Sequence, residues 1–270
     1  MGSRKEQKPL KTSLRNPKRP RRRRLTLIDS KDNNVTQNKQ NIESDNNIQP
    51  ASASEQLRFF LDQFQSAKGL QLSSLERESI KDTCMLELTQ GSDHDVKTLG
   101  KDIKAAFGKS WKEVLYDGQL LEGKIDAGSP AVLIVSYSAL RSIELLRGFR
   151  SLTGECCAVK LFSKHMKVEE QVQLLKNRVN IASGTPSRIK KLIDIEALGL
   201  SRLQVLLLDM YPDVKGYSLF SLPQVRDEFW ELYKNYFYER MVRGDLRVCL
   251  YGPYQLAAVH LKGKRGLPND

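Results

Sequence analysis

Long apolar runs are missing from this sequence, and so is any dense set of metal-binding side chains. No apolar stretch approaches the length of a transmembrane helix, and the charged N-terminus lacks the apolar stretch of a secretory signal. Only three histidines are present, and none has a nucleophile or carboxylate partner visible in the sequence. Four cysteines without a second close pair do not suggest a disulfide framework or a zinc site, and they favour buried thiols in a reducing compartment: Cys84, Cys156, Cys157 and Cys249.

Positive charge is abundant but concentrated at one end. The net charge is +12, and residues 1–24 hold eleven Lys or Arg against one acid, Glu6, so that tract carries about +10 and the remainder about +2. Dense like charge with prolines predicts a disordered tail that binds phosphate nonspecifically and acts as a nuclear-localisation signal. The alternative is a solvated tail without a specific partner. The residues of the predicted signal are Arg15, Lys18, Arg19, Arg21, Arg22, Arg23 and Arg24.

Composition divides the chain into four parts. Residues 1–54 form the basic tail and a linker rich in Asn, Gln, Ser and Asp. Residues 55–128 hold a helical extension expected to pack on the core, and residues 129–255 hold the core itself. Residues 256–270 form a short basic C-terminal tail.

Strand and helix patterns alternate in the core with short connections. This alternation predicts a parallel, doubly wound α/β sheet with helices on both faces. The predicted strands are apolar runs rich in β-branched residues: 131–136, 157–162, 179–183, 205–209 and 246–251. Helices are predicted between the strands over 139–152, 168–175 and 223–242. A further helix begins after the third strand, with Thr185 as its N-cap and Pro186 at its first position.

Helical spacing also precedes the core, over 55–66, 75–88 and 95–116. The last segment carries an apolar and aromatic stripe at spacings of three and four, which favours a packing face over a ligand site: Val96, Leu99, Ile103, Phe107, Trp111 and Leu115.

The tripeptide Gly108–Ser110 matches the last three residues of the phosphate-binding loop motif. That motif requires Gly at the position of Ile103, a preceding strand and a Gly-rich turn before a helix. Here the tripeptide lies within an amphipathic helix pattern, so we interpret Lys109 as a surface residue.

The core resembles the first RecA-like domain of DEAD-box RNA helicases. In that family Thr-Pro-Gly-Arg follows a strand and grips the RNA backbone, and the matching residues here are Thr185, Pro186, Ser187 and Arg188. Ser138–Arg141 occupies the place of the earlier backbone-binding motif. Asp209 occupies the place of the metal-binding Asp of Asp-Glu-Ala-Asp, and Leu250–Gly252 falls where Ser-Ala-Thr would be.

The departures from that family exclude its reaction. Met210 replaces the Glu that orients the attacking water, and a thioether neither accepts a proton nor holds a water by charge. The phosphate-binding loop with its Lys is missing as well, because the tripeptide Gly108–Ser110 lies in a helix pattern. Eighteen residues follow Gly252, so we expect no second RecA-like domain. We therefore expect no ATPase activity and no cofactor.

Taken together, the motifs are similar to those of the Cms ribosomal small subunit homolog family. The resemblance rests on 133–136, 139–141, 160–165, 184–188 and 206–209 with the basic tail. It implies a noncatalytic protein of the nucleus and nucleolus that acts in small-subunit ribosomal RNA biogenesis. The implied partners are pre-ribosomal RNA and assembly proteins, with no membrane and no small-molecule substrate. Two alternatives are a scaffold that docks on assembly factors and, less favoured, a residual nucleotide-binding enzyme.

The candidate RNA-binding residues have structural alternatives. Thr185 to Arg188, with Arg141, join a helix N-terminus to arginines, which is a phosphate-binding arrangement. Thr-Pro is also a common cap, and Arg188 can pair with an acid. A single carboxylate, Asp209, holds Mg²⁺ poorly, so we expect no metal and a turn-capping role. The exposed segment 160–167 offers lysines beside Phe162, either for base stacking or as a solvated strand end.

Overall fold

The computed structural model describes residue 2 and residues 51–69, 71–88, 96–117, 126–156 and 158–253. Every helix and strand below belongs to one compact unit, residues 48–270. The predicted nuclear-localisation residues and the short basic tail 256–270 lie outside the described residues.

Five parallel strands form the central sheet, in the order β2-β3-β1-β4-β5. This arrangement confirms the predicted parallel α/β sheet. The strands are β1 (Val132–Val135), β2 (Val159–Leu161), β3 (Ile181–Gly184), β4 (Val205–Asp209) and β5 (Arg247–Tyr251). All residues of β1, β3 and β4 are buried, as expected for strands covered on both faces.

The direction of the crossovers decides which helix covers which face. The chain steps from β1 outward to β2 and then moves back across the sheet to β5, so right-handed connections place the first helix on one face and the later helices on the other. These helices are α4 (Ala139–Arg147), α5 (Val168–Leu175), α6 (Pro186–Asp194) and α7 (Pro223–Leu232), which continues through a π-helical turn, η5 (Tyr233–Phe237), into α8 (Tyr238–Val242). Leu133 and Val135 of β1 join the larger apolar cluster, whereas Val132 and Ile134 join the cluster on the α4 face.

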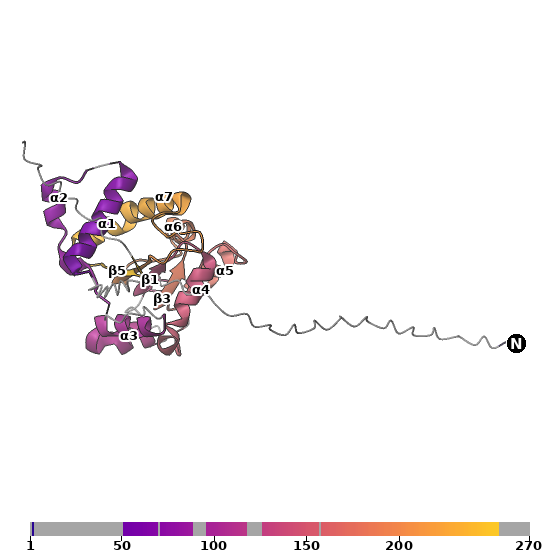
Figure 1. The fold of residues 1–270 in the computed structure, drawn as a ribbon. Helices are drawn as coiled ribbons and strands as arrows, with labels where there is room; N and C mark the ends of the chain where they lie inside the picture. The colour runs from indigo at the N-terminus through magenta and orange to yellow at the C-terminus, as the bar shows by residue number, and fades with distance from the viewer. Residues whose placement is uncertain are drawn as a thin grey trace, which may run out of the picture. The chain divides into compact units, whose positions relative to one another are not determined.

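Two of the N-terminal helices complete the layers. Helix α1 (Ala53–Lys68) begins at a capping box between Ser52 and Glu55 and lies beside α7 (Figure 1), with the Phe60 ring centroid 5.2 Å from that of Trp230. Helix α3 (Val96–Ala106) lies on the opposite face with α4 and buries Leu99 and Ile103. The predicted packing of the 95–116 stripe against the core is therefore confirmed, because its later members Phe107 and Leu115 are buried in the same cluster and Trp111 packs against it.

The predicted helix over 75–88 is wrong after its first turns. Helix α2 (Ser74–Ser79) ends at the extended residue Ile80, and a 3₁₀ turn, η1 (Asp82–Cys84), follows. Met85 then forms a parallel bridge with Val248 of β5, and the Leu86 N–H donates to the Val248 carbonyl oxygen at 2.8 Å. Pairing with the free edge of β5 overrides the local helical spacing, as tertiary context often does.

The predicted helix over 95–116 is interrupted. Helix α3 ends at Ala106, and Gly108 adopts a φ of +52°, a left-handed conformation that glycine tolerates. A 3₁₀ turn, η2 (Gly108–Ser110), and a π-helical turn, η3 (Lys112–Tyr116), follow. Lys109 is exposed in η2, which agrees with its interpretation as a surface residue.

Candidate functional site at the carboxyl edge of the sheet

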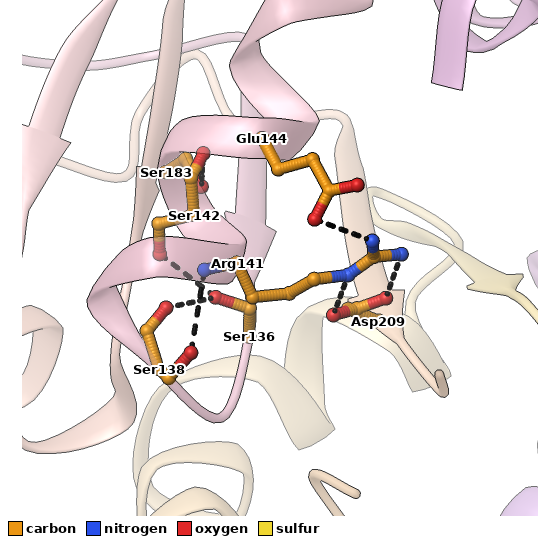
Figure 2. A network of polar contacts seen from close by, with 7 residues as sticks. All are labelled: Ser136, Ser138, Arg141, Ser142, Glu144, Ser183 and Asp209. Carbon is orange, nitrogen blue, oxygen red and sulfur yellow. Dashed lines mark hydrogen bonds and ion pairs between the residues drawn. The ribbon is translucent and has the colours of Figure 1, made fainter. Parts of the chain in front are cut away.

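Serine hydroxyls fix the first turn of α4 immediately after β1. Ser138 is the N-cap, and its Oγ accepts from the Arg141 N–H at 3.3 Å. Ser136 Oγ lies 2.7 Å from Ser142 Oγ and donates to the Ser138 carbonyl oxygen at 3.0 Å. Ser183 of β3 reaches the Ser142 carbonyl oxygen at 3.5 Å. Figure 2 shows this network at the start of α4, with the Arg141 side chain extending away from it toward Asp209 at the end of β4.

The Arg141 guanidinium binds both oxygens of Asp209. Nε donates to Oδ2 at 2.8 Å and Nη2 donates to Oδ1 at 3.0 Å, the two-pronged geometry of a strong charge-assisted pair (Figure 2). Glu144, one turn along α4, accepts from Nη1 at 3.0 Å. The Arg141 carbon Cζ also lies 4.8 Å from the Tyr211 ring centroid and 6.0 Å from that of Tyr251.

Burial and charge act in opposite directions on this pair. The Asp209 side chain is fully buried and the Arg141 side chain is 12% exposed. Burial raises the pKa of Asp209, and the hydrogen bonds and charge of Arg141 oppose that rise. Burial would lower the pKa of Arg141, but the bonds to Asp209 and Glu144 outweigh it and raise that pKa. The ion pair therefore supplies the charge balance that a buried carboxylate requires.

This pair fills the place where a metal-bound nucleotide would be expected. A Mg²⁺ ion at Asp209 would have to displace a guanidinium that already binds both carboxylate oxygens. Met210, in the position of the expected glutamate, is 5% exposed and packs in the core. The residues present do not fit a magnesium–nucleotide complex. The expected turn-capping role of Asp209 is supported by a hydrogen bond from the Tyr211 N–H, but the sequence did not reveal Arg141 as its main partner. Arg141, predicted as an RNA contact, lies mostly buried in this pair.

The second predicted segment lies where β3 passes into α6. A Cβ at Gly184 would meet the Leu161 carbonyl oxygen at 2.0 Å, so only glycine fits beside β2 there. Thr185 occupies the N-cap position, yet its side chain makes no capping hydrogen bond, and its N–H donates to Leu161. Pro186 is buried at the first helical position, and Ser187 is exposed. The first-turn amides of α6 thus lie at the carboxyl edge, as the sequence predicts.

Arg188 is held by neutral acceptors. Its Nη1 donates to the Gln171 side-chain oxygen at 2.6 Å and to the Met166 carbonyl oxygen at 3.2 Å. Gln171 is fully buried, and its amide donates to the carbonyl oxygens of Lys160 and Phe162 at 2.8 and 3.0 Å. Arg188 therefore orients a glutamine that satisfies the outer carbonyls of edge strand β2. Such partners do not neutralise its positive charge.

The base-stacking alternative for Phe162 does not fit its position. Phe162 is 4% exposed, whereas Lys160, Lys164 and Lys167 are exposed. Arg141 and Arg188 lie at the same edge of the sheet, Arg141 in α4 after β1 and Arg188 in α6 after β3. Their hydrogen-bond partners are different residues.

A sequence pattern close to that of a phosphate-binding loop directly precedes α3, upstream of the tripeptide Gly108–Ser110. The spacing Gly91-x₄-Val96-Lys97-Thr98 matches the phosphate-loop pattern except for Val96 in place of the second glycine. The structure provides the surrounding context: Met85 pairs with β5 before it, and α3 begins at Val96 after it. Residues 89–95 themselves lie outside the described residues. A search for the tripeptide Gly-Lys-Ser misses this pattern, because the corresponding residues are Val96, Lys97 and Thr98.

Val96 departs from the phosphate-loop pattern at the position of its second glycine. It is half-buried and packs on the α4-face cluster, and a Cβ on Gly148 would meet the Val96 carbonyl oxygen at 2.0 Å. The second glycine of such loops lets the backbone approach phosphate closely, and a β-branched residue there removes that freedom.

Neither a metal centre nor a membrane helix occurs in the part of the chain that the structure describes. Among the described residues, no three His, Cys, Asp or Glu side chains gather closely enough to hold a metal ion. No helix in the described ranges is both long enough and apolar enough to span a bilayer.

The fold and the edge define a class: a RecA-like α/β domain with an internal ion pair where its ligand crevice would be. The chain belongs to the family described as CMS1, U3-containing 90S pre-ribosomal complex subunit, whose model matches residues 2–251. The resemblance inferred from the sequence is thereby confirmed.

Relatives in animals and fungi carry closely similar names. The chain is 32% identical over 180 residues to human Protein CMSS1, a match that covers 66% of this chain and 60% of the human protein. Protein CMS1 of Chaetomium thermophilum is 44% identical over 84 residues, covering 30% of this chain and 34% of that protein. The chain thus spans about three fifths of the human relative's length.

Solved structures with a similar fold include DEAD-box proteins. A DEAD box protein from Methanococcus jannaschii is 17% identical with a TM-score of 0.33, covering 70% of this chain and 46% of that one. Dbp5 L327V of S. cerevisiae, bound to RNA and ADP BeF3, is 15% identical with a TM-score of 0.35, covering 75% of this chain and 46% of Dbp5.

Proposed function

We propose that this protein is a noncatalytic, RNA-associated component of early pre-ribosomal particles, acting in the nucleolus in small-subunit ribosomal RNA biogenesis. The family match supports membership of a pre-ribosomal complex. The observation that carries the noncatalytic part is the two-pronged Arg141–Asp209 pair, because it commits the one acidic side chain that a helicase-like reaction would use for metal binding.

Phosphoryl transfer depends on positioning and charge neutralisation by a phosphate loop, a metal ion and a water-orienting residue. Each has a defined replacement in this chain: Val96 in the loop pattern, Arg141 on the metal-binding carboxylate and Met210 at the catalytic position. The three replacements act on different parts of the reaction. No single substitution would therefore restore it.

The RNA contact that we propose for the folded unit is the α6 end of the edge, Thr185, Pro186, Ser187 and Arg188. First-turn amides form a favourable environment for phosphate together with an arginine that has no carboxylate partner among the described residues. Arg141 is assigned an internal role, because both prongs of its guanidinium are occupied. Residues 1–24 add nonspecific affinity and, in this proposal, nuclear import.

A scaffold that docks on assembly proteins is the second candidate. The internal hydrogen bonds of both edge arginines favour it, since each guanidinium already has partners within the domain. In that case the basic tail would carry most of the contact with RNA.

Deleting residues 1–24 separates tail from fold. We expect the shortened chain to stay in the cytoplasm when expressed with a fluorescent tag, because the tract holds nearly all the net charge. Its affinity for single-stranded RNA should also depend less on salt, by about 0.7 in the logarithmic slope for each phosphate that the tail neutralises. Restoring import with an unrelated nuclear signal should return the protein to particles that sediment with pre-ribosomal RNA. Failure to return, with the fold intact by circular dichroism, contradicts the assignment of particle binding to the folded unit.

A further inference from the structure

Exposed lysines gather at the carboxyl end of edge strand β2. Lys160 lies on the strand, and Lys164, His165 and Lys167 follow in the segment 163–167, which we call the basic turn. None of the ion pairs among the described residues involves these three lysines, whereas Lys190 on α6 pairs with two acids. The charge of the basic turn is therefore available to a partner.

The conformation of the basic turn displays these side chains. The Met166 N–H donates to the Ser163 carbonyl oxygen at 3.4 Å, which closes a tight turn. His165 has a φ of +60°, a left-handed conformation that is uncommon outside glycine. Lys167 then occupies the N-cap position of α5. Lys164, His165 and Lys167 thus lie within four positions of a short, bent segment.

Arg188 fastens the basic turn to the sheet. Its Nη1 binds the Met166 carbonyl oxygen of the turn and the oxygen of buried Gln171, and Gln171 holds the Lys160 and Phe162 carbonyls on the strand before it. One arginine therefore fixes the backbone on both sides of Lys164. Because these contacts are local, removing Arg188 should release the turn without opening the core.

We infer that Lys160, Lys164 and Lys167 form a binding site for the phosphate backbone of RNA, and that Arg188 acts as the positioning residue of this site. The inference deepens the proposed function and rests on it. The neighbouring first turn of α6 adds exposed Ser187 and its amide, so the favourable surface continues from β2 to β3. Glu169 and Glu170 bound it on the α5 side, where Glu170 accepts from the Lys167 N–H at 3.3 Å.

The test compares two triple variants of the full-length chain. One carries Lys160→Ala, Lys164→Ala and Lys167→Ala. The matched control carries Lys81→Ala, Lys109→Ala and Lys234→Ala, which removes the same charge from exposed positions elsewhere. Both keep the basic tail. The probe is a uridine 20-mer, with binding measured over a salt series and ultraviolet crosslinks mapped to peptides. We expect only the first variant to lose crosslinks over 158–176, and its logarithmic salt slope to fall by about 2 relative to the control, at about 0.7 per neutralised phosphate.

The positioning role has its own readout. Arg188→Met should raise hydrogen exchange of the amides over 163–167 and lower the crosslinks there, although all three lysines remain. Arg188→Lys, which keeps one donor group in reach, should restore part of both signals. Loss of crosslinks without faster exchange would leave Arg188 only the direct RNA contact of the proposed function and overturn the positioning role.

The outcomes also separate this inference from the proposed function. If the two triple variants lose crosslinks equally, the β2 site is wrong while an RNA-binding edge at α6 still stands. If no peptide from 51–253 crosslinks in the unaltered chain, both RNA assignments to the folded unit fail. Continued sedimentation with pre-ribosomal particles would then identify an assembly factor held by protein contacts, including any acidic segment that binds the basic turn.

Discussion

Two arginines at the same edge of one sheet have opposite surroundings. Arg141 is 12% exposed and binds a buried carboxylate through two hydrogen bonds, with Glu144 on its third nitrogen. Arg188 binds an amide oxygen and a backbone carbonyl, beside lysines that face solvent. Both stand in motifs that resemble RNA-gripping segments. The comparison shows that position in a motif does not determine what a charged side chain does, because the partners it finds in the fold decide.

The two halves of the edge differ accordingly in electrostatics. At β1 and β4 the arginine neutralises an acid, and Tyr211 and Tyr251 pack against its guanidinium. At β2 and β3 the acceptors are neutral, so the positive charge remains. We therefore expect a phosphate chain to be attracted to the β2–β3 half of the edge rather than to the β1–β4 half, where Arg141 is already paired with Asp209 and Glu144.

The largest expected effect comes from breaking the Arg141–Asp209 pair. Asp209→Ala leaves a mostly buried guanidinium without its main partner, and we expect the free energy of unfolding to fall by about 3–5 kcal/mol. Urea denaturation followed by fluorescence measures it. As a control, Asp227→Ala breaks an exposed pair with Arg226 and should cost about 0–1 kcal/mol.

A double variant sharpens this result. Arg141→Met with Asp209→Leu replaces the pair by apolar side chains and should recover much of the stability that Asp209→Ala removes. Equal losses for Asp209→Ala and Asp227→Ala would mean that the buried pair does not balance charge as described.

A smaller effect is expected at the other arginine. Arg188→Met leaves Gln171 and the Met166 carbonyl without a donor, at a cost of about 1–3 kcal/mol in the same unfolding measurement. No buried charge is left behind, so the loss should be smaller than for Asp209→Ala. The reverse order would invert the comparison between the two halves of the edge.

Most of the fold was predictable because the strands are short apolar runs bounded by polar and turn-forming residues. Val205–Asp209 and Val168–Leu175 match their predicted bounds. The clearest failure has a tertiary cause: at Met85 a contact with β5, far away in the sequence, replaced a locally plausible helix. Periodicity reports which residues are buried, but it does not reveal an edge that is open for pairing.

The site was less predictable for the same reason. Sequence spacing placed Thr185 to Arg188 and Arg141 at the carboxyl edge, which follows from parallel topology alone. It did not reveal that Arg141 reaches Asp209, sixty-eight positions away, because no local pattern encodes that contact. Nor did it reveal Gln171, whose importance depends on the unpaired carbonyls of an edge strand.

The central claim is that the Arg141–Asp209 pair occupies the place where a nucleotide would bind. Calorimetry of the chain with ATP and Mg²⁺ tests it most directly. The pair on Asp209, together with Val96 and Met210 in place of loop and catalytic residues, predicts no binding heat at ATP concentrations up to the millimolar range. A clear isotherm at micromolar ATP would contradict the account, because the nucleotide would then have displaced Arg141 or found a phosphate site that Val96 does not block.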